Sequence, residues 1–387
     1  MKILGFLACG FGLLMSFSCA KSDNVYDTFH VVKSSADKNM SLNLETVHLD
    51  TVHLDTMHLD TVHCSGESFS GITPDGTIYY LDRYFGWLYE FSQDGKLLGR
   101  KLGFGRGPEE TLIKKSVCFV NSESGEYAMC GKSLDFELFS KDYKKENSFR
   151  ISYGEGTTEP DSFRTYSNAW SNMVGRLHDG LLYQGKMSEN PSFNYFDNTE
   201  SYLKESMHMS VVNMRSGEIE GMKVTGFPSV YGKDPYKFSS FQCINFDVNK
   251  DGNMYVNFEA DSLIYVFDKD MKPQFAFGAG GKNMDRDYSS VSSWEQMPVY
   301  QTNRETKGYY SWVECIDETG MCFRSYRKGD GSEVDGLQIY DRKGKLLGDV
   351  DVPRDFKVTG YAAPYYYSQV FDGEDDGSLC IYRFKLD

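Results

Sequence analysis

Residues 75–105 read DGTIYYLDRYFGWLYEFSQDGKLLGRKLGFG, and residues 251–281 read DGNMYVNFEADSLIYVFDKDMKPQFAFGAGG. The two stretches align without a gap, so that their opening Asp-Gly pairs coincide and Gly105 falls on Gly281. Each reads as a turn, two strands separated by a gap, a second turn, a third strand and a Gly-rich exit. A β-rich unit that recurs at a distance several times its own length predicts a repeat array, which in an all-β chain is a propeller.

The second turn of the unit recurs along the chain. Turns with similar surroundings lie near Gly95, Tyr143, Gly217, Met271 and Gly344. Residues 365–387 end in a strand-like segment at 379–384 and start a sixth unit that lacks its last strands. A strand from within residues 28–49 would complete that unit. We therefore predict an all-β, six-bladed β-propeller whose ring is closed by an N-terminal strand joining the C-terminal blade, with five and seven blades as alternatives.

The N-terminus indicates export. Met1 and Lys2 supply a short positive start, and the apolar run at 3–17 is too short for a comfortable membrane span. The run ends in Ser16-Phe17-Ser18-Cys19-Ala20, which resembles the lipobox of bacterial lipoproteins. The resemblance implies that residues 1–18 are a signal peptide and that Cys19 is acylated. The chain would then be an outer-membrane lipoprotein, on either face. The alternative is an ordinary secretory signal that happens to contain a Cys.

Residues 19–64 are expected to be a tether that includes the closing strand, and residues 65–387 the propeller. Within the tether, residues 45–63 carry the repeats TVHLD, TVHLD, TMHLD and TVH. Their histidines are His48, His53, His58 and His63. Neighbouring histidines would lie about 17 Å apart on an extended chain. We therefore favour a duplicated linker or strand extension over a metal-binding tract.

Composition narrows the class of partner. The 387-residue chain has 27 Tyr, 27 Phe and 37 Gly, which favours short strands joined by tight turns. Its 56 acidic and 41 basic side chains give a formal net charge of −15. Because a phosphate-binding surface needs the opposite sign, nucleic acid is excluded as the expected partner.

The cysteine count limits the possible disulfide bonds. Of nine, Cys9 lies in the signal peptide and Cys19 in the lipobox, which leaves seven. An odd number in an oxidising compartment means that at least one stays unpaired within the chain. Cys118 and Cys130 are the best disulfide candidates, because a hairpin loop at 123–125 would set them opposite each other. Even so, we favour the interpretation that both are buried thiols on strands.

The exit of the first unit carries a family signature. Residues 103–110 read GFGRGPEE, which resembles the Gly-x-Gly-Arg-Gly-Pro-Gly-Glu signature of Bacteroidetes six-bladed, TolB-like propeller lipoproteins, with Glu109 in place of the usual Gly. The Asp-Gly-x-Ile-Tyr pattern upstream is also similar to NHL-type blades. The resemblance implies a propeller in the cell envelope and no particular mechanism. The glycine spacing does not fit a dinucleotide loop, so we read the segment as a crossover between blades, with Arg106 holding it to a neighbouring blade.

Aromatic clusters are the candidate contacts with a ligand or partner. Their representatives are Tyr84, Trp87, Trp312 and Tyr366. Aromatic rings near acidic groups suit stacking on sugars or gripping a peptide, whereas the alternative role is packing between blades. Metal ligands could come from Asp247, Asn249, Asp251 and Asn257, although such residues more often stabilise β-turns.

Two functions follow from these observations. The first is a lipid-anchored, non-enzymatic binding or scaffold module for a protein or glycan partner. The alternative is a metal-dependent hydrolase or lyase, similar to the propeller lactonases, that acts at the central channel. No catalytic residue, metal ligand or cofactor is assigned from the sequence. Acylated Cys19 would connect the protein to the membrane.

Overall fold

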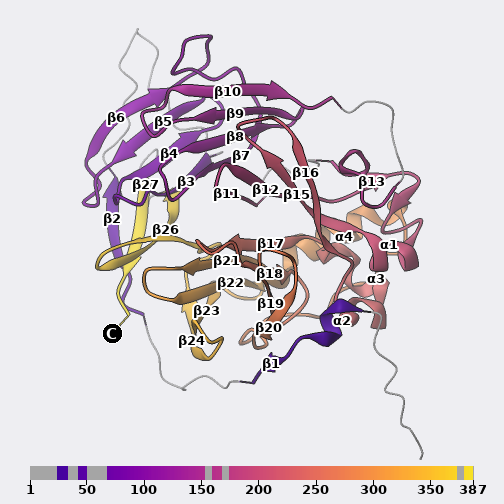
Figure 1. Ribbon diagram of the computed structural model, residues 1–387. Coiled ribbons are helices and arrows are strands. Elements are labelled where there is room, and N and C mark those ends of the chain that lie inside the picture. The colour runs from indigo at the N-terminus through magenta and orange to yellow at the C-terminus, as the bar shows by residue number, and fades with distance from the viewer. Residues whose placement is uncertain are drawn as a thin grey trace, which may run out of the picture.

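The chain folds as a six-bladed β-propeller in the computed structural model (Figure 1). The structure describes residues 24–33, 42–49, 68–152, 159–167, 174–372 and 379–386. Blade 1 contains β3 (Ser68–Ile72), β4 (Ile78–Asp82), β5 (Trp87–Phe91) and β6 (Leu97–Leu102). Blade 2 contains β7 (Ser116–Asn121), β8 (Tyr127–Gly131), β9 (Asp135–Phe139) and β10 (Lys145–Arg150). Blade 3 contains β11 (Gly175–His178), β12 (Leu181–Gly185), β15 (Met207–Asn213) and β16 (Ile219–Thr225).

The other three blades complete the ring. Blade 4 contains β17 (Ile244–Val248), β18 (Met254–Phe258), β19 (Ile264–Phe267) and β20 (Pro273–Phe277). Blade 5 contains β21 (Lys307–Ile316), β22 (Met321–Gly329), β23 (Asp335–Asp341) and β24 (Leu346–Val352). Blade 6 contains β25 (Val358–Ala362), β26 (Tyr365–Asp372), β27 (Leu379–Phe384) and, as its outermost strand, β2 (Glu45–Leu49). The first strands of the blades touch in a cycle, β3–β7–β11–β17–β21–β25 and back to β3, and so surround the axis.

The hydrophobic core lies between the blades. Among the described residues it divides into six clusters, each joining two neighbouring blades. The inner strands are therefore covered on both faces, and β4 is buried at all five positions. The outer strand β6 instead alternates between half-buried and exposed side chains. This difference explains why the inner strands are rich in Tyr, Phe, Ile and Val.

The five recurring turns lie where the sequence predicts them, between the third and fourth strands of blades 1–5. Each has a residue with positive φ at the turn, and three of these five residues are glycines. At Gly344 (φ 78°) an added Cβ would lie 2.6 Å from the ring of Phe277 in blade 4. This turn therefore requires a residue without a side chain. The segment 379–384, predicted as a strand, is β27.

All four α-helices of the described residues lie on one face of the propeller, which we call the helical face. They occupy connections after the second or fourth strand of a blade: α1 (Thr199–Glu205), α2 (Ser229–Lys233), α3 (Pro235–Phe238) and α4 (Met297–Thr306). Figure 1 shows them gathered beside blades 3 and 4, at the right of the view. The strand–turn–strand units predicted from the sequence do not include α1 and α4, which are additions to the predicted fold. None of the described helices is long and apolar enough to cross a bilayer.

Two N-terminal segments pack on different blades. The strand Glu45–Leu49 (β2) pairs antiparallel with β27 of blade 6. The short strand β1 (Val31–Val32) pairs instead in parallel with β20 of blade 4. Just before it, the 3₁₀ turn η1 (Val25–Thr28) buries Tyr26, and Phe29 follows it into the same core cluster. Residues 24–33, expected to belong to the tether, thus lie against the propeller.

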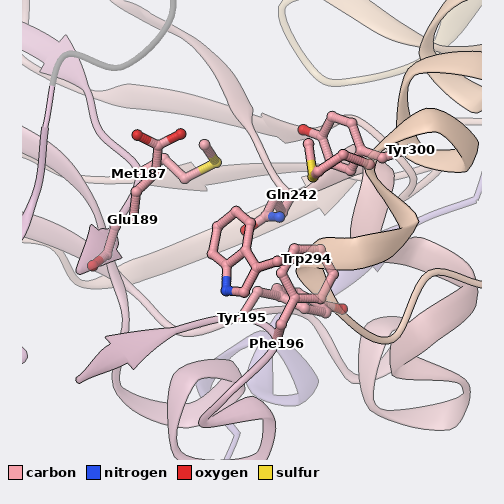
Figure 2. A pocket seen from close by; sticks show the side chains of 9 residues that line it. Met187, Glu189, Tyr195, Phe196, Gln242, Trp294 and Tyr300 are labelled. Carbon is pink, nitrogen blue, oxygen red and sulfur yellow. The ribbon is translucent and has the colours of Figure 1, made fainter. Parts of the chain in front are cut away.

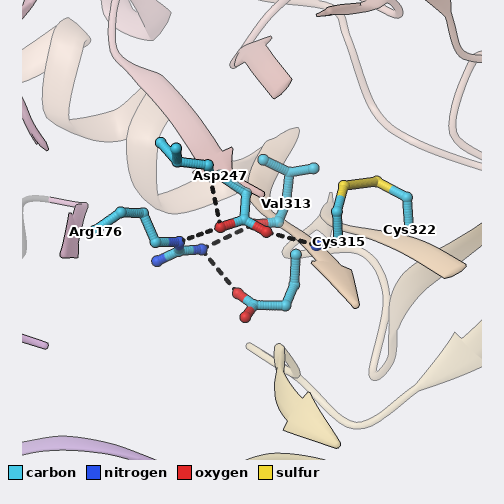
Figure 3. Close-up of a disulfide and its surroundings, with 7 residues drawn as sticks. Arg176, Asp247, Val313, Cys315 and Cys322 are labelled. Atoms are coloured by element: carbon cyan, nitrogen blue, oxygen red, sulfur yellow. Dashed lines mark hydrogen bonds and ion pairs between the residues drawn. A yellow bond between two sulfur atoms is a disulfide. The ribbon is translucent and has the colours of Figure 1, made fainter. Parts of the chain in front are cut away.

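Cys118 and Cys130, the candidate disulfide pair, are both thiols in the structure. The two residues do face each other in the β7–β8 register, and the turn at Gly125 is formed as predicted. Both side chains are buried, as in the interpretation that the sequence favoured, and burial raises the pKa of Cys118. The disulfide in the structure joins Cys315 and Cys322, which are opposite each other on β21 and β22 (Figure 3).

The crossover at 103–110 is also held differently from the prediction. Arg106 is exposed. A carboxylate oxygen of Glu110 instead accepts a hydrogen bond from the backbone N–H of Gly107, 2.7 Å away. The backbone N–H of Lys145, in blade 2, donates to the carbonyl of Pro108 at 2.7 Å. The loop is therefore fixed mainly by backbone groups and by Glu110.

Candidate functional site

A cavity of about 810 Å³ lies on the axis of the ring. The first strand of every blade contributes to its wall, with Phe69, Phe119, Gly175, Asn245, Trp312 and Thr359 as one example from each blade. Cavities of this size accommodate small organic ligands. Because all six blades converge here, this channel is the candidate functional site.

A cluster of charged side chains joins three blades on one side of the channel. Arg176 of β11 extends between blades 4 and 5, where its Nε donates to Asp247 at 2.6 Å and its Nη2 to Glu314 at 2.8 Å (Figure 3). The guanidinium also lies 4.5 Å from the centre of the Trp312 ring. Asp247 in turn accepts from the backbone N–H of Cys315 at 2.7 Å. The cluster therefore connects three blades and places Glu314 and Trp312 on the channel.

Glu314 is the most perturbed carboxyl group of this cluster. Burial raises its pKa from 4.5 to about 8, and the neighbouring charge of Asp247 acts in the same direction. Arg176 favours the ionised form, but burial outweighs this attraction. At neutral pH, Glu314 therefore carries a proton in most molecules.

A second ion pair lies at the end of the channel nearest the helical face. Arg304, in the last turn of α4, donates to Glu259 at 2.6 Å, and its guanidinium stacks 4.4 Å from the centre of the Tyr309 ring. Glu259 follows β18 and also accepts from the backbone N–H of Cys243 at 3.2 Å. Burial nevertheless raises the pKa of Glu259. Helix α4 thus supplies a cation to the mouth of the channel.

The crossover into blade 6 contributes Arg354, Asp355 and Lys357 to the channel wall. Arg354 donates to backbone carbonyls, among them that of Ser332 through Nε at 3.0 Å. The Lys357 amine lies 5.4 Å from the centre of the Trp312 ring, and burial lowers its pKa. The Trp312 ring therefore has two cations near it, Arg176 and Lys357.

Of the four aromatic candidates, only Trp312 lines the channel. Its ring N–H donates to the carbonyl of Val358 at 2.8 Å, which joins blades 5 and 6. Tyr84 is 71% exposed and lies between β4 and β5. Trp87, at the start of β5, stacks on Phe85 with ring centres 4.9 Å apart. Tyr84 and Trp87 therefore share a surface patch that is separate from the channel.

Tyr366 is 4% exposed and belongs to the core cluster between blades 5 and 6. Its ring packs against Phe323 and Phe384, with centres 4.9 and 5.3 Å away. This position gives Tyr366 the packing role that was the alternative for the aromatic clusters.

A further aromatic cluster lies beside α4 on the helical face (Figure 2). Trp294 packs on Phe196 with ring centres 4.8 Å apart, and Tyr195, Tyr300 and Met187 surround the same point. The cavity there is about 10 Å³, which holds about one water molecule. A cavity of this size is a packing void that cannot hold an organic ligand. The channel therefore remains the candidate site.

The four residues considered as metal ligands do not converge. Asp247 is paired with Arg176, while Asn249 accepts from the backbone N–H groups of Asp251 and Asn253 and so stabilises a turn. Asn257 is buried near Arg324 of the next blade. Across the described ranges, no group of three or more acidic, His or Cys side chains is arranged to hold a metal ion. Cys19, Cys64 and the histidines from His53 to His63 lie outside those ranges.

Sequence reasoning missed the charged groups of the channel. Arg176, Glu259, Arg304 and Lys357 come from four separate blades or connections, and no local motif joins them. Glu259 lies just after the second strand of its unit, at the end of the strand that opens on the helical face. In the overlay of the two repeated stretches it falls on Arg83, which does not line the channel. The repeat therefore gave no signal for the site.

Comparisons with known proteins support the fold. No family model and no curated protein matches the chain. A DUF4221-family structure from Bacteroides vulgatus is similar with a TM-score of 0.63 at 12% identity, covering 89% of this chain and 97% of its own. A Bacteroides fragilis structure described as an exported protein has a TM-score of 0.51 at 15% identity, covering 92% of this chain and 99% of its own. Both likenesses extend over nearly the whole chain and concern the fold alone.

Proposed function

We propose that the protein is a lipid-anchored propeller of the cell envelope that acts as a non-enzymatic binding module for a protein or glycan partner, and that the partner is bound through the central channel. The observation that carries this proposal is the cavity of about 810 Å³ at which all six blades meet. Its wall combines aromatic rings with charged and hydroxyl-bearing side chains. This combination is typical of sites in which apolar contacts supply affinity and a few polar groups supply specificity.

The envelope location rests on two observations. Residues 16–20 resemble a lipobox, with Cys19 as the acylated residue. A similarly folded protein from Bacteroides fragilis is described as exported. Tyr26 and Phe29 belong to the core of blades 3 and 4. An anchor at Cys19 would be followed within a few residues by chain that is fixed to the propeller.

The experiment is crosslinking in intact cells, followed by purification of the propeller and mass spectrometry of what remains attached. We expect the wild type to retain one partner in near-stoichiometric amount. Ser311→Trp places an indole on the channel wall, because Ser311 is a half-buried residue of β21 that lines the cavity. We expect this variant to lose the partner while keeping the thermal unfolding profile of the wild type.

The matched control is Leu98→Trp on the outer strand β6, where the native side chain is 58% exposed. This variant adds the same indole far from the channel and should retain the partner. Equal recovery with Ser311→Trp would show that the channel is not the site. Recovery of no protein or glycan by the folded wild type would contradict a binding function.

A further inference from the structure

The balance of charge on the channel wall is opposite in sign to that of the whole chain. The whole chain has a formal net charge of −15. The charged side chains that line the cavity are Arg176, Glu259, Arg304, Glu314, Arg354, Asp355 and Lys357. Cations therefore outnumber carboxylates here, in a protein where the opposite holds overall. Protonation of Glu314 at neutral pH removes one more negative charge.

The cations differ in how they are neutralised. Arg176 is neutralised by Asp247 and also contacts Glu314, and Arg304 is paired with Glu259. On blade 6 the situation is different. Among the described residues, neither Arg354 nor Lys357 makes an ion pair.

Lys357 is the clearest case. It is half-buried, and its amine has no hydrogen-bond acceptor among the described residues. The adjacent carboxylate of Asp355 lies 3.9 Å from Arg327, and its side chain is 67% exposed. Removing an ammonium group from water without a partner is costly. In a cavity of this size, an anion from outside the chain would remove that cost.

We propose that the channel binds a carboxylated sugar, and that Lys357 and Arg354 hold its carboxylate. The inference rests on the function proposed above and specifies the ligand. A sugar suits the rest of the wall, because hydroxyl groups of a ligand need both donors and acceptors. The hydroxyls of Ser68 and Ser311 line the cavity and make no hydrogen bond to other described residues. Trp312 and Tyr309 add aromatic surface between the charged groups.

The test is isothermal titration of the purified chain with oligosaccharides that contain glucuronate, galacturonate or sialic acid. Each is titrated beside its own methyl ester, which keeps the shape and removes the charge. We expect at least one acid to bind about tenfold or more tightly than its ester, as for a hydrogen bond to a charged group. Lys357→Gln should weaken binding of the acid by about the same factor and leave binding of the ester unchanged.

Lys343→Gln is the matched control, because Lys343 is exposed at a turn on the other face of blade 5. It should bind the acid as the wild type does. Lys357→Arg should recover part of the affinity, since it restores the charge. Phosphorylated sugars form a further arm, and binding of these alone would overturn the assignment of a carboxylate.

The two levels of the proposal fail separately. Equal binding of acid and ester, or no binding by any carboxylated sugar, overturns the inference about the ligand. If Ser311→Trp still abolishes capture of a partner in cells, the channel remains a binding site for something else. If the wild type also captures no partner in cells, the proposed function itself fails.

Discussion

Arg176 and Arg324 show two ways in which this chain buries a guanidinium between blades. Arg176 is neutralised by the carboxylate of Asp247 on blade 4 and also contacts Glu314 on blade 5. Arg324 is fully buried, and its acceptors are neutral: the carbonyls of Ser262 at 2.8 Å and Ala279 at 2.7 Å, and the amide oxygen of Gln338 at 3.0 Å. Its ring partner Tyr310 lies 3.9 Å away. Both arginines are satisfied within the chain, so their role is to join blades. The Lys357 amine has no hydrogen-bond acceptor among the described residues, and it remains available to a ligand.

The carboxyl group of Glu314 should make stability depend on pH. Its pKa is raised by burial from 4.5 to about 8, so between these values the folded state holds a proton that the unfolded state releases. This contribution is complete below pH 4.5 and is lost as the pH rises through about 8. Between pH 5 and pH 9 we expect the wild type to lose about 1–3 kcal/mol more unfolding free energy than Glu314→Gln.

Urea unfolding at a series of pH values measures this difference. Glu318→Gln is the control, because Glu318 is exposed in the adjacent turn and its variant should follow the wild-type profile. If Glu314→Gln and the wild type lose stability in parallel across the range, burial does not hold the proton on Glu314.

At the scale of elements, local chemistry decided what the sequence could predict. Each turn between third and fourth strands is a local signal, because a positive φ favours Gly and the flanking strands are rich in Tyr and Phe. Helix α4 gave no comparable signal, since its buried positions Tyr300 and Asn303 are set by contacts with other elements. Pro298 near its first turn was the one local indication.

The site was harder to predict than the fold for the same reason. A channel wall is made of single side chains from six blades, and their proximity depends on the closed ring. Trp312 was recognised because it lies in a dense aromatic cluster. Arg354 and Lys357 lie in an ordinary-looking crossover, and the cluster of Arg176, Asp247 and Glu314 joins residues from three blades. The pairing of β1 with blade 4 is likewise non-local, because it connects Val31 to Ala276.

The element that contains Tyr26 should contribute measurably to stability. The Tyr26 ring packs edge-on against Tyr265 and Phe258, with centres 4.8 and 5.3 Å away, and its hydroxyl donates to the carbonyl of Thr225 at 3.1 Å. We expect Tyr26→Ala to lower the unfolding free energy by about 3 kcal/mol, because it removes a buried aromatic ring. Urea unfolding of the purified chain gives the value.

Val25→Ala is the neighbouring control, since Val25 is 36% exposed and its loss should cost less than about 1 kcal/mol. Equal effects of the two variants would mean that η1 does not depend on the Tyr26 ring. A small effect of both would mean that the segment contributes little to the stability of blades 3 and 4.

At the scale of the whole molecule, the sign of the charge separates the surface from the channel. A chain with a net charge of −15 repels polyanions over most of its surface. A carboxylated ligand must therefore approach the channel as a small molecule or as the end of a chain, where the local cations outweigh the distant acidic groups. Salt screens the distant charges more than the partly buried contact. For this reason, moderate salt should weaken binding of the carboxylated ligand in the channel only slightly. The same salt would weaken adsorption of this ligand to an open basic surface more strongly.

The last prediction concerns how the propeller is held at the membrane. Four residues lie between Cys19 and Asn24, where the described chain begins, and the five Cα–Cα steps across them span at most about 18 Å. An acyl group on Cys19 would therefore hold the side of the propeller formed by blades 3 and 4, where Asn24 and Tyr26 pack, close to the bilayer. We expect Cys19→Ser to move the protein from the membrane fraction to the soluble fraction and to abolish incorporation of labelled palmitate. Cys9→Ser, in the expected signal peptide, should leave both unchanged. Because the substitution lies outside the propeller, thermal unfolding should match that of the wild type. Membrane retention of Cys19→Ser after a carbonate wash would show that another part of the chain provides the anchor.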